Sequence, residues 1–217
     1  MKPSVHKKHS STLCILPTAL MVEEELKRIA RESGLVTGYR VMTFPELMNI
    51  LSNDFSVKQR QISSIGELLL IKDAADAVLK DADDACLSPI KDSPLFYRSL
   101  YKFIRELRQA IIGSKDFEYA VKPVKNKKYS LLASIYSSYE KSLSSLNLTD
   151  DIGRQWSILK GLEDYAGLPP SLSNIEKIVI DGFYDLTQIQ RKLVKAFIDK
   201  GIDRSIIPIY SLENPDA

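Results

Sequence analysis

A β-branched run, an acidic turn and a capped helix, together residues 175–201, constrain this chain more than any other stretch. Residues 177–180 read Lys-Ile-Val-Ile, which is typical of a strand buried on both faces of a parallel sheet. Thr187 and Gln190 have the spacing of a capping box, so we expect a helix to begin there and to end near Gly201. Strand, turn and helix make half of a βαβ unit, whose chemistry lies at the carboxyl end of the strand.

The amino-terminal part of the chain repeats this pattern. Residues 12–16 and 39–42 are apolar runs that predict two strands, with an amphipathic helix between them. Two strands joined by one helix favour a right-handed parallel βαβ unit. Thr18 and Thr43 each precede a predicted helix, and on spacing alone they are helix caps, with Phe44 a core residue.

The middle of the chain has helical periodicity and no strand signal. We expect amphipathic helices at residues 66–83, 95–112, 131–146 and 153–165. The sequence therefore predicts an α/β protein with three parts: a frayed tail (1–11), an α/β core in two segments (12–54 and 171–217) and a helical insert (55–170) that interrupts it.

Composition excludes several classes of protein. The net charge of +2 over 217 residues is too small to indicate nucleic-acid binding by itself. No apolar run reaches the roughly 20 residues that span a bilayer, so we expect a cytoplasmic protein without membrane contact. Cys14 and Cys86 have no metal-binding or redox spacing, and no metal site or catalytic residue is predicted.

Two local groups of basic residues are candidates for a nucleic-acid path. Four lysines fall within seven residues of an expected loop: Lys122, Lys125, Lys127 and Lys128. Basic residues also recur on one side of the helix expected at 95–112, namely Arg98, Lys102, Arg105 and Arg108. Such patches bind phosphates in a salt-dependent, sequence-independent way. The alternative is that both are ordinary solvated surface.

The turn after the 177–180 run also carries a family resemblance. Residues 181–190 read Asp-Gly-Phe-Tyr-Asp-Leu-Thr-Gln-Ile-Gln, which resembles the Walker B segment of superfamily-1 (UvrD-like) helicases. It is more similar to the version in AddB/RexB-type subunits of bacterial double-strand-break repair nucleases, whose helicase-like domain has lost its motor chemistry. The resemblance makes Asp181, Asp185 and Gln190 remnants of that segment. Gly182 stands where an active motor has the glutamate that activates water.

Both amino-terminal turns extend the resemblance. The segment around Thr18 is similar to motif Ia, and the segment with Thr43 and Phe44 is similar to motif Ib, although Pro45 replaces a histidine of that motif. In the family these turns contact single-stranded DNA. The resemblance therefore implies DNA contacts at Thr18, Thr43 and Phe44, in addition to those at the basic residues.

The resemblance also implies a fold and a function. It predicts a RecA-like parallel sheet interrupted by a 1B-like helical insert, as the amino-terminal part of a longer repair-nuclease subunit. The domain would bind and scan single-stranded DNA or a duplex end, while the partner subunit of an AddAB-type heterodimer binds ATP and Mg²⁺. No G-x-x-x-x-G-K-[ST] motif is present, so we expect no cofactor and no ATP hydrolysis here.

Two other functions stay open on the sequence. One is a structural module that docks the motor partner without contacting DNA. The other is a small α/β enzyme in which Asp181 and Asp185 bind Mg²⁺. Salt-dependent DNA binding through the four lysines separates the first alternative from a DNA-binding domain, and a metal titration tests the second.

Overall fold

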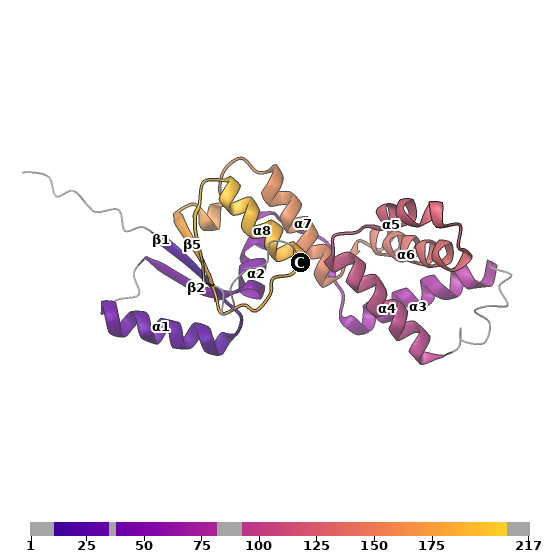
Figure 1. Cartoon of the computed structure of the whole chain (residues 1–217), viewed down its shortest axis with the longest axis horizontal. Coiled ribbons are helices and arrows are strands. Elements are labelled where there is room, and N and C mark those ends of the chain that lie inside the picture. Colours follow the sequence, from indigo (N-terminus) through magenta and orange to yellow (C-terminus); the bar gives the residue numbers. More distant parts are fainter. Residues whose placement is uncertain (1–10, 35–37, 82–92, 208–217) are drawn as a thin grey trace, which may run out of the picture. The chain divides into compact units, whose positions relative to one another are not determined.

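The computed structural model describes residues 11–34, 38–81 and 93–207. They form two compact units (Figure 1): the chain up to Ser56 joins the chain from Ile158 onward, and Val57–Ser157 forms the second unit. The first boundary, after Ser56, lies close to the expected start of the insert at residue 55. The second boundary, after Ser157, lies 13 residues before the expected end of the insert at residue 170. The expected tail lies outside the described residues except for Ser11, which begins the first strand.

The first unit is built on a four-stranded sheet in which all neighbouring strands are parallel. Their order is β2-β1-β5-β6, with bounds β1 Ser11–Leu16, β2 Tyr39–Thr43, β5 Ile175–Asp181 and β6 Asp203–Ile207. The chain winds from β1 toward one edge and from β5 toward the other. The sheet therefore has a topological switch point between β1 and β5, where ligands of open α/β sheets bind. The expected parallel α/β class is confirmed.

Capping explains where the helices of the first unit begin. They are α1 Ala19–Ser33, α2 Phe44–Asp54, α8 Gln188–Asp199 and the second half of α7 Asp151–Asp164, with a short 3-10 turn, η2 Pro170–Leu172. The predicted capping box of Thr187 with Gln190 is present, and the predicted cap Thr43 forms a second capping box with Glu46. In Figure 1, α1 lies on one side of the sheet, and α2 and α8 lie on the other.

The two faces of β5 are not equally buried. Ile178 and Ile180, on the side of α2 and α8, are almost completely buried. Lys177 and Val179 point to the side of α1 and are only half-buried, because α1 packs against β1 and β2. The expectation that residues 177–180 are buried on both faces is therefore wrong for one face.

The second unit is mostly helical. Its helices are α3 Ser64–Asp81, α4 Pro94–Gln109, α5 Ser114–Val121, the 3-10 turn η1 Lys122–Val124, α6 Lys127–Ser145 and the first half of α7. The four predicted helices correspond to α3, α4, α6 and α7. Two features were not predicted: α5, and a two-residue parallel ladder between β3 Arg60–Gln61 and β4 Leu148–Thr149.

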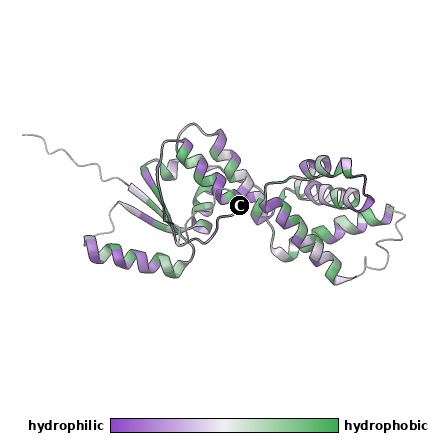
Figure 2. Ribbon diagram, viewed as in Figure 1, coloured by the Kyte–Doolittle hydropathy of each residue, from purple (hydrophilic) through white to green (hydrophobic). Residues whose placement is uncertain are grey.

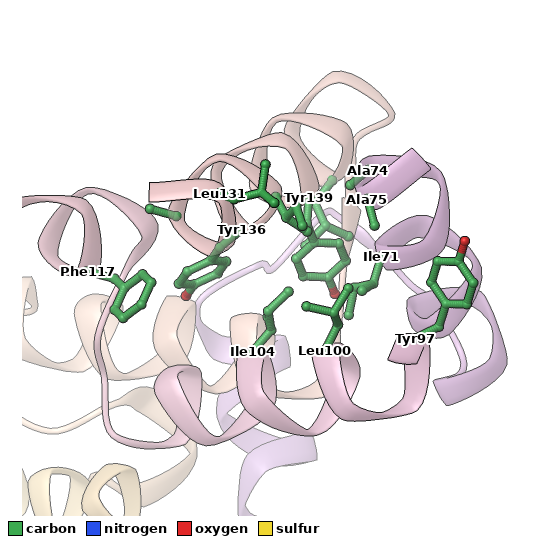
Figure 3. Packing of buried hydrophobic residues seen from close by; sticks show 13 residues of the cluster. Ile71, Ala74, Ala75, Tyr97, Leu100, Ile104, Phe117, Leu131, Tyr136 and Tyr139 are labelled. Carbon is green, nitrogen blue, oxygen red and sulfur yellow. The ribbon is translucent and has the colours of Figure 1, made fainter. Parts of the chain in front are cut away.

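The core of the second unit lies between α3, α4 and α6 (Figure 3). Ile71, Leu100 and Ile104 converge there on the rings of Tyr136 and Tyr139. Apolar and polar residues alternate along each helix (Figure 2), as amphipathic helices around a shared core require. Within the described ranges, no helix is both long enough and apolar enough to cross a bilayer.

Candidate nucleic-acid interface

The carboxyl edge of the sheet gathers three strand-to-helix turns, because parallel strands end at the same edge. In the turn after β1, Thr18 is exposed, and its Oγ1 accepts a hydrogen bond from the backbone N–H of Met21 at 3.2 Å. The Thr18 side chain is thus the N-cap of α1. Its hydroxyl stays accessible to solvent, as a phosphate contact at a helix N-terminus would require.

The turn after β2 is closed by its own contacts. Oγ1 of Thr43 accepts from the Glu46 N–H at 3.4 Å and donates to the Glu46 carboxylate at 2.9 Å. Phe44 is only 4% exposed, and its ring packs edge to face on Phe183 with centroids 5.3 Å apart. As folded here, the Phe44 ring offers no face to a base, and the Thr43 hydroxyl is fully used by the cap. Both residues have the structural roles that spacing alone predicts.

The loop after β5 is held in place by polar contacts within the loop and with α8. Asp185 lies 2.6 Å from the Arg191 guanidinium and accepts from the Leu186 N–H. Gln190 completes the capping box by accepting from the Thr187 N–H at 2.9 Å. Asp185 and Gln190 are therefore used to order the loop and to start α8.

Gly182 occupies a crowded position with a left-handed backbone (φ +79°). A β-carbon built there would lie 2.4 Å from Cε of Met21 and 3.2 Å from Cδ of Pro17. Residues with a side chain rarely adopt this backbone conformation. Pro17 and Met21 thus lie directly beside Gly182 at the carboxyl ends of β1 and β5.

Asp181 shares a sheet face with Cys14, because Cys14 pairs with Val179 in the register of β1 and β5. Burial, followed by the nearby carboxylates of Glu25 and Asp181, raises the pKa of the Cys14 thiol to about 11. Over the described ranges, no group of three or more histidine, cysteine or acidic side chains converges as metal ligands would.

Some of the predicted basic residues of α4 are exposed, and others are neutralised by carboxylates. Arg98 is exposed, as is Lys102, whose ammonium lies 4.0 Å from Glu106. Arg105 instead bridges two carboxylates, with Nη1 2.8 Å from Glu67 and both terminal nitrogens 2.8–2.9 Å from Asp151. A guanidinium held in this way is not free for a phosphate, which removes Arg105 from the strongest candidates.

Arg108 lies in the core, so its assignment to the polar side of the helix is wrong. It is 4% exposed, and its guanidinium contacts Glu140 at 2.9 Å and Asp150 at 3.1 Å. The Trp156 ring lies 4.8 Å from the guanidinium carbon. Tyr139 donates to the other oxygen of Asp150 at 2.8 Å. We call these residues the buried arginine network.

Nearby carboxylates offset the cost of burying the Arg108 charge in this network. Burial opposes the charge on Arg108, but Asp150 and other neighbours offset that effect and raise the pKa of the guanidinium. Burial and the Asp150 carboxylate raise the pKa of Tyr139, which keeps its hydroxyl protonated as a donor. Arg108 and Asp150 therefore act as a structural ion pair.

The four predicted lysines lie together at the junction of α5, η1 and α6, and all are exposed. Lys122, Lys125 and Lys128 form no ion pair with any residue in the described part of the chain. Lys127 and Lys128 occupy the first turn of α6, which contains no acidic residue. We call the four residues the lysine cluster.

Two exposed aromatic residues beside the lysine cluster were missed by the sequence interpretation. Tyr119 on α5 is 82% exposed, and Tyr129 in the first turn of α6 is 40% exposed. Exposed aromatic rings among lysines provide the stacking surface that single-stranded nucleic acid uses. The sequence alone could have indicated them, because both tyrosines lie within six residues of a cluster lysine.

Comparison with models of protein families gives no match, and a search among curated proteins also gives none.

Proposed function

We propose that this chain is a helicase-like domain that binds nucleic acid without hydrolysing ATP, of the kind found in AddB-type subunits of repair nucleases. The proposal includes a RecA-like core, a 1B-like helical insert and a partner subunit that binds ATP and Mg²⁺. It is supported by the parallel sheet, by the helical unit between β2 and β5, and by the Asp-Gly-Phe-Tyr-Asp loop at the carboxyl end of β5.

The lysine cluster carries the binding part of the proposal. Arg105 and Arg108 in the same helical unit are neutralised by carboxylates, whereas Lys122, Lys125 and Lys128 have no acidic partner in the described chain. Ammonium groups left unneutralised side by side repel one another and favour an anionic ligand. Tyr119 and Tyr129 add ring faces that suit unpaired bases.

Gly182 supports the absence of hydrolysis. An active motor needs a glutamate at this position to activate water, as the resemblance implies. The left-handed backbone makes a side chain unfavourable at Gly182, and Pro17 leaves little room for one. The loop is therefore folded around the glycine, and a single substitution will not restore the base in its working position.

The first experiment replaces Lys122, Lys125, Lys127 and Lys128 together with alanine. Binding of a fluorescent single-stranded oligonucleotide is measured by anisotropy over a range of salt concentrations. Each lost phosphate contact lowers the salt slope by about 0.7 for single strands, so the full variant should lose up to roughly 2.8. A slope equal to that of the wild type would reject the lysine cluster as the binding surface.

The second experiment measures phosphate release from Mg²⁺-ATP with single-stranded DNA present. We expect no turnover above a protein-free control, from the wild type or from Gly182→Glu. DNA-stimulated turnover by the wild type would contradict the proposal.

A docking module is the second candidate function, and one observation favours it. Leu20 and Tyr184 are 66% and 79% exposed, and they follow the carboxyl ends of the adjacent strands β1 and β5. Exposed apolar and aromatic side chains are typical anchors of protein interfaces. Under this function, Leu20→Ser with Tyr184→Ser would abolish capture of the motor partner, while the four-alanine variant would bind that partner normally.

A further inference from the structure

A groove with a volume of about 610 Å³ lies between the ends of α3 and α5 and one face of α6. Val78, Val121 and Ala133 supply its apolar lining. The rest of the lining is polar and includes Lys122, which also belongs to the lysine cluster. The groove is therefore continuous with the lysine cluster through a shared residue.

The charged groups of the groove favour an anion. Lys122 and Lys141 are exposed and form no ion pair with a described residue. Glu118 is the acidic residue among those that line the groove. Two ammonium groups against one carboxylate leave a net positive charge, and the cluster lysines at the end of the groove increase it.

Hydroxyl groups along α6 supply neutral donors. The Ser134 hydroxyl donates to the Ser130 carbonyl at 3.1 Å. The hydroxyls of the half-buried Ser137 and Ser138 have no hydrogen-bond partner among the described residues. A serine hydroxyl that is not used within its helix can donate to a phosphate oxygen. Along α6 these hydroxyls lie between the lysine cluster and Lys141.

The spacing along α6 matches an extended polyanion. Lys127, Ser130, Ser134, Ser137 and Lys141 follow one another at intervals of three and four residues, so they share one helix face. Fourteen residues of helix span about 21 Å. A face of this length can meet several successive phosphates of one extended strand.

We propose that this groove binds the phosphodiester backbone of one nucleic-acid strand, which continues from the lysine cluster toward Lys141. Lys141, Ser137 and Ser138 become phosphate contacts, and Tyr119 and Tyr129 stack on bases near the lysine cluster. The strand is single, because paired bases in a duplex turn inward and present no face to these rings. This inference rests on the proposed nucleic-acid binding and names additional residues that perform it.

The test compares Lys141→Ala with Lys160→Ala, an exposed lysine of α7 that lies outside the groove. Anisotropy is measured with a twelve-nucleotide oligothymidylate and with a duplex of equal length. We expect Lys141→Ala to weaken single-strand binding about tenfold, as expected for one charge-assisted hydrogen bond, and to lower the salt slope by about 0.7. Lys160→Ala should change neither quantity, and Lys141→Arg should restore most of the affinity.

Other outcomes separate this inference from the proposed function. Equal effects of Lys141→Ala and Lys160→Ala, with the four-alanine variant still impaired, would reject the groove and keep the lysine cluster. A wild-type protein that binds no oligonucleotide would reject both. Inorganic polyphosphate that competes as well as oligothymidylate, together with unchanged binding by Tyr119→Ser, would show a general polyanion site and overturn the assignment to a nucleic-acid strand.

Discussion

The helical unit contains basic residues that look alike in the sequence but differ in burial and in ion pairing. Arg105 and Arg108 on α4 are bound by carboxylates from three other parts of the unit. The residues of the lysine cluster are exposed at a helix junction, and three of them have no acidic partner in the described chain. Arginine suits the first task, because its planar guanidinium binds two carboxylates at once.

The difference shows how charge is divided between folding and binding in this unit. Arg105 and Arg108 join α4 to α3, α6 and the start of α7, and so add ion pairs to the apolar core of the unit. In the lysine cluster, Lys122, Lys125 and Lys128 form no ion pair with a described residue, so their charge is available to a ligand. Removing an arginine should therefore harm stability first, and removing a lysine should harm binding first.

The largest effect is expected from Arg108→Leu. The change leaves Asp150 and Glu140 without their cation, and Asp150 is 1% exposed. Breaking a buried pair by removing one partner typically costs about 3–5 kcal/mol. Urea denaturation should show this loss, and Arg98→Leu, on the exposed side of the same helix, should stay within about 0.5 kcal/mol of the wild type. Equal stability of the two variants would show that the network contributes nothing.

A smaller loss is expected from Gly153→Ala in the first turn of α7. The added β-carbon would lie 2.7 Å from Nη2 of Arg108 and 2.8 Å from Oγ1 of Thr149. Crowding a packed site of this kind typically costs about 1–3 kcal/mol. Gly66→Ala in α3 is the matched control, because its β-carbon meets no atom closer than 3.4 Å. That variant should be stabilised by up to about 1 kcal/mol, and stabilisation of Gly153→Ala as well would refute the close packing.

The carboxylates around Arg105 should shape the pH dependence of stability in opposite directions. Burial raises the pKa of Asp151, but its hydrogen bonds to Arg105 more than offset this, and the pKa is lowered overall. Stability from Asp151 is therefore present above its unfolded pKa of about 4 and is lost as the pH falls through the lower folded value. Burial dominates at Glu67 and raises its pKa, so stability falls as the pH rises above about 4.3.

Urea denaturation at pH 3 to 7 separates these contributions. Asp151→Asn should remove part of the loss of stability on acidification, and Glu67→Gln should remove part of the loss that begins as the pH rises above about 4.3. Asp73→Asn, on the exposed side of α3, is the control and should leave the shape of the curve unchanged. Identical curves for all three variants would show that Arg105 does not organise these two carboxylates.

Local pattern was enough to predict the sheet and most helices. The capping boxes at Thr43 and Thr187 and the β-branched run before Asp181 are local signals, and the structure contains the elements they predict. The half-buried side of β5 was missed, because the position of α1 over β1 and β2 depends on packing. The eight-residue α5 was missed, because it is too short to show a clear period.

Arg108 shows why the site was harder to predict than the fold. Tyr97, Leu100, Ile104 and Arg108 share the buried face of α4, so its spacing fits the core and its charge fits the surface. Glu140 and Asp150 lie 32 and 42 residues further along the chain, where no local pattern connects them to Arg108. The lysine cluster was predicted because its four members are neighbours in sequence.

The smallest effect, and the sharpest test of the comparison, is expected from Lys128→Glu. A cation in the first turn of a helix opposes the helix dipole, and an anion there is favourable by roughly 0.3–1 kcal/mol. Lys128 lies in the first turn of α6, so the variant should be more stable than the wild type by an amount in this range and should bind single-stranded DNA more weakly. Lys160→Gln, on the exposed side of α7, removes a lysine charge outside the groove and should leave binding unchanged. A gain in stability together with a loss of binding would show that Lys128 contributes to binding and lowers the stability of α6. Arg108 has the opposite role, because it stabilises the packing of α4. A loss of stability would mean that Lys128 supports the fold, and the division between the two basic sets would fail at this residue.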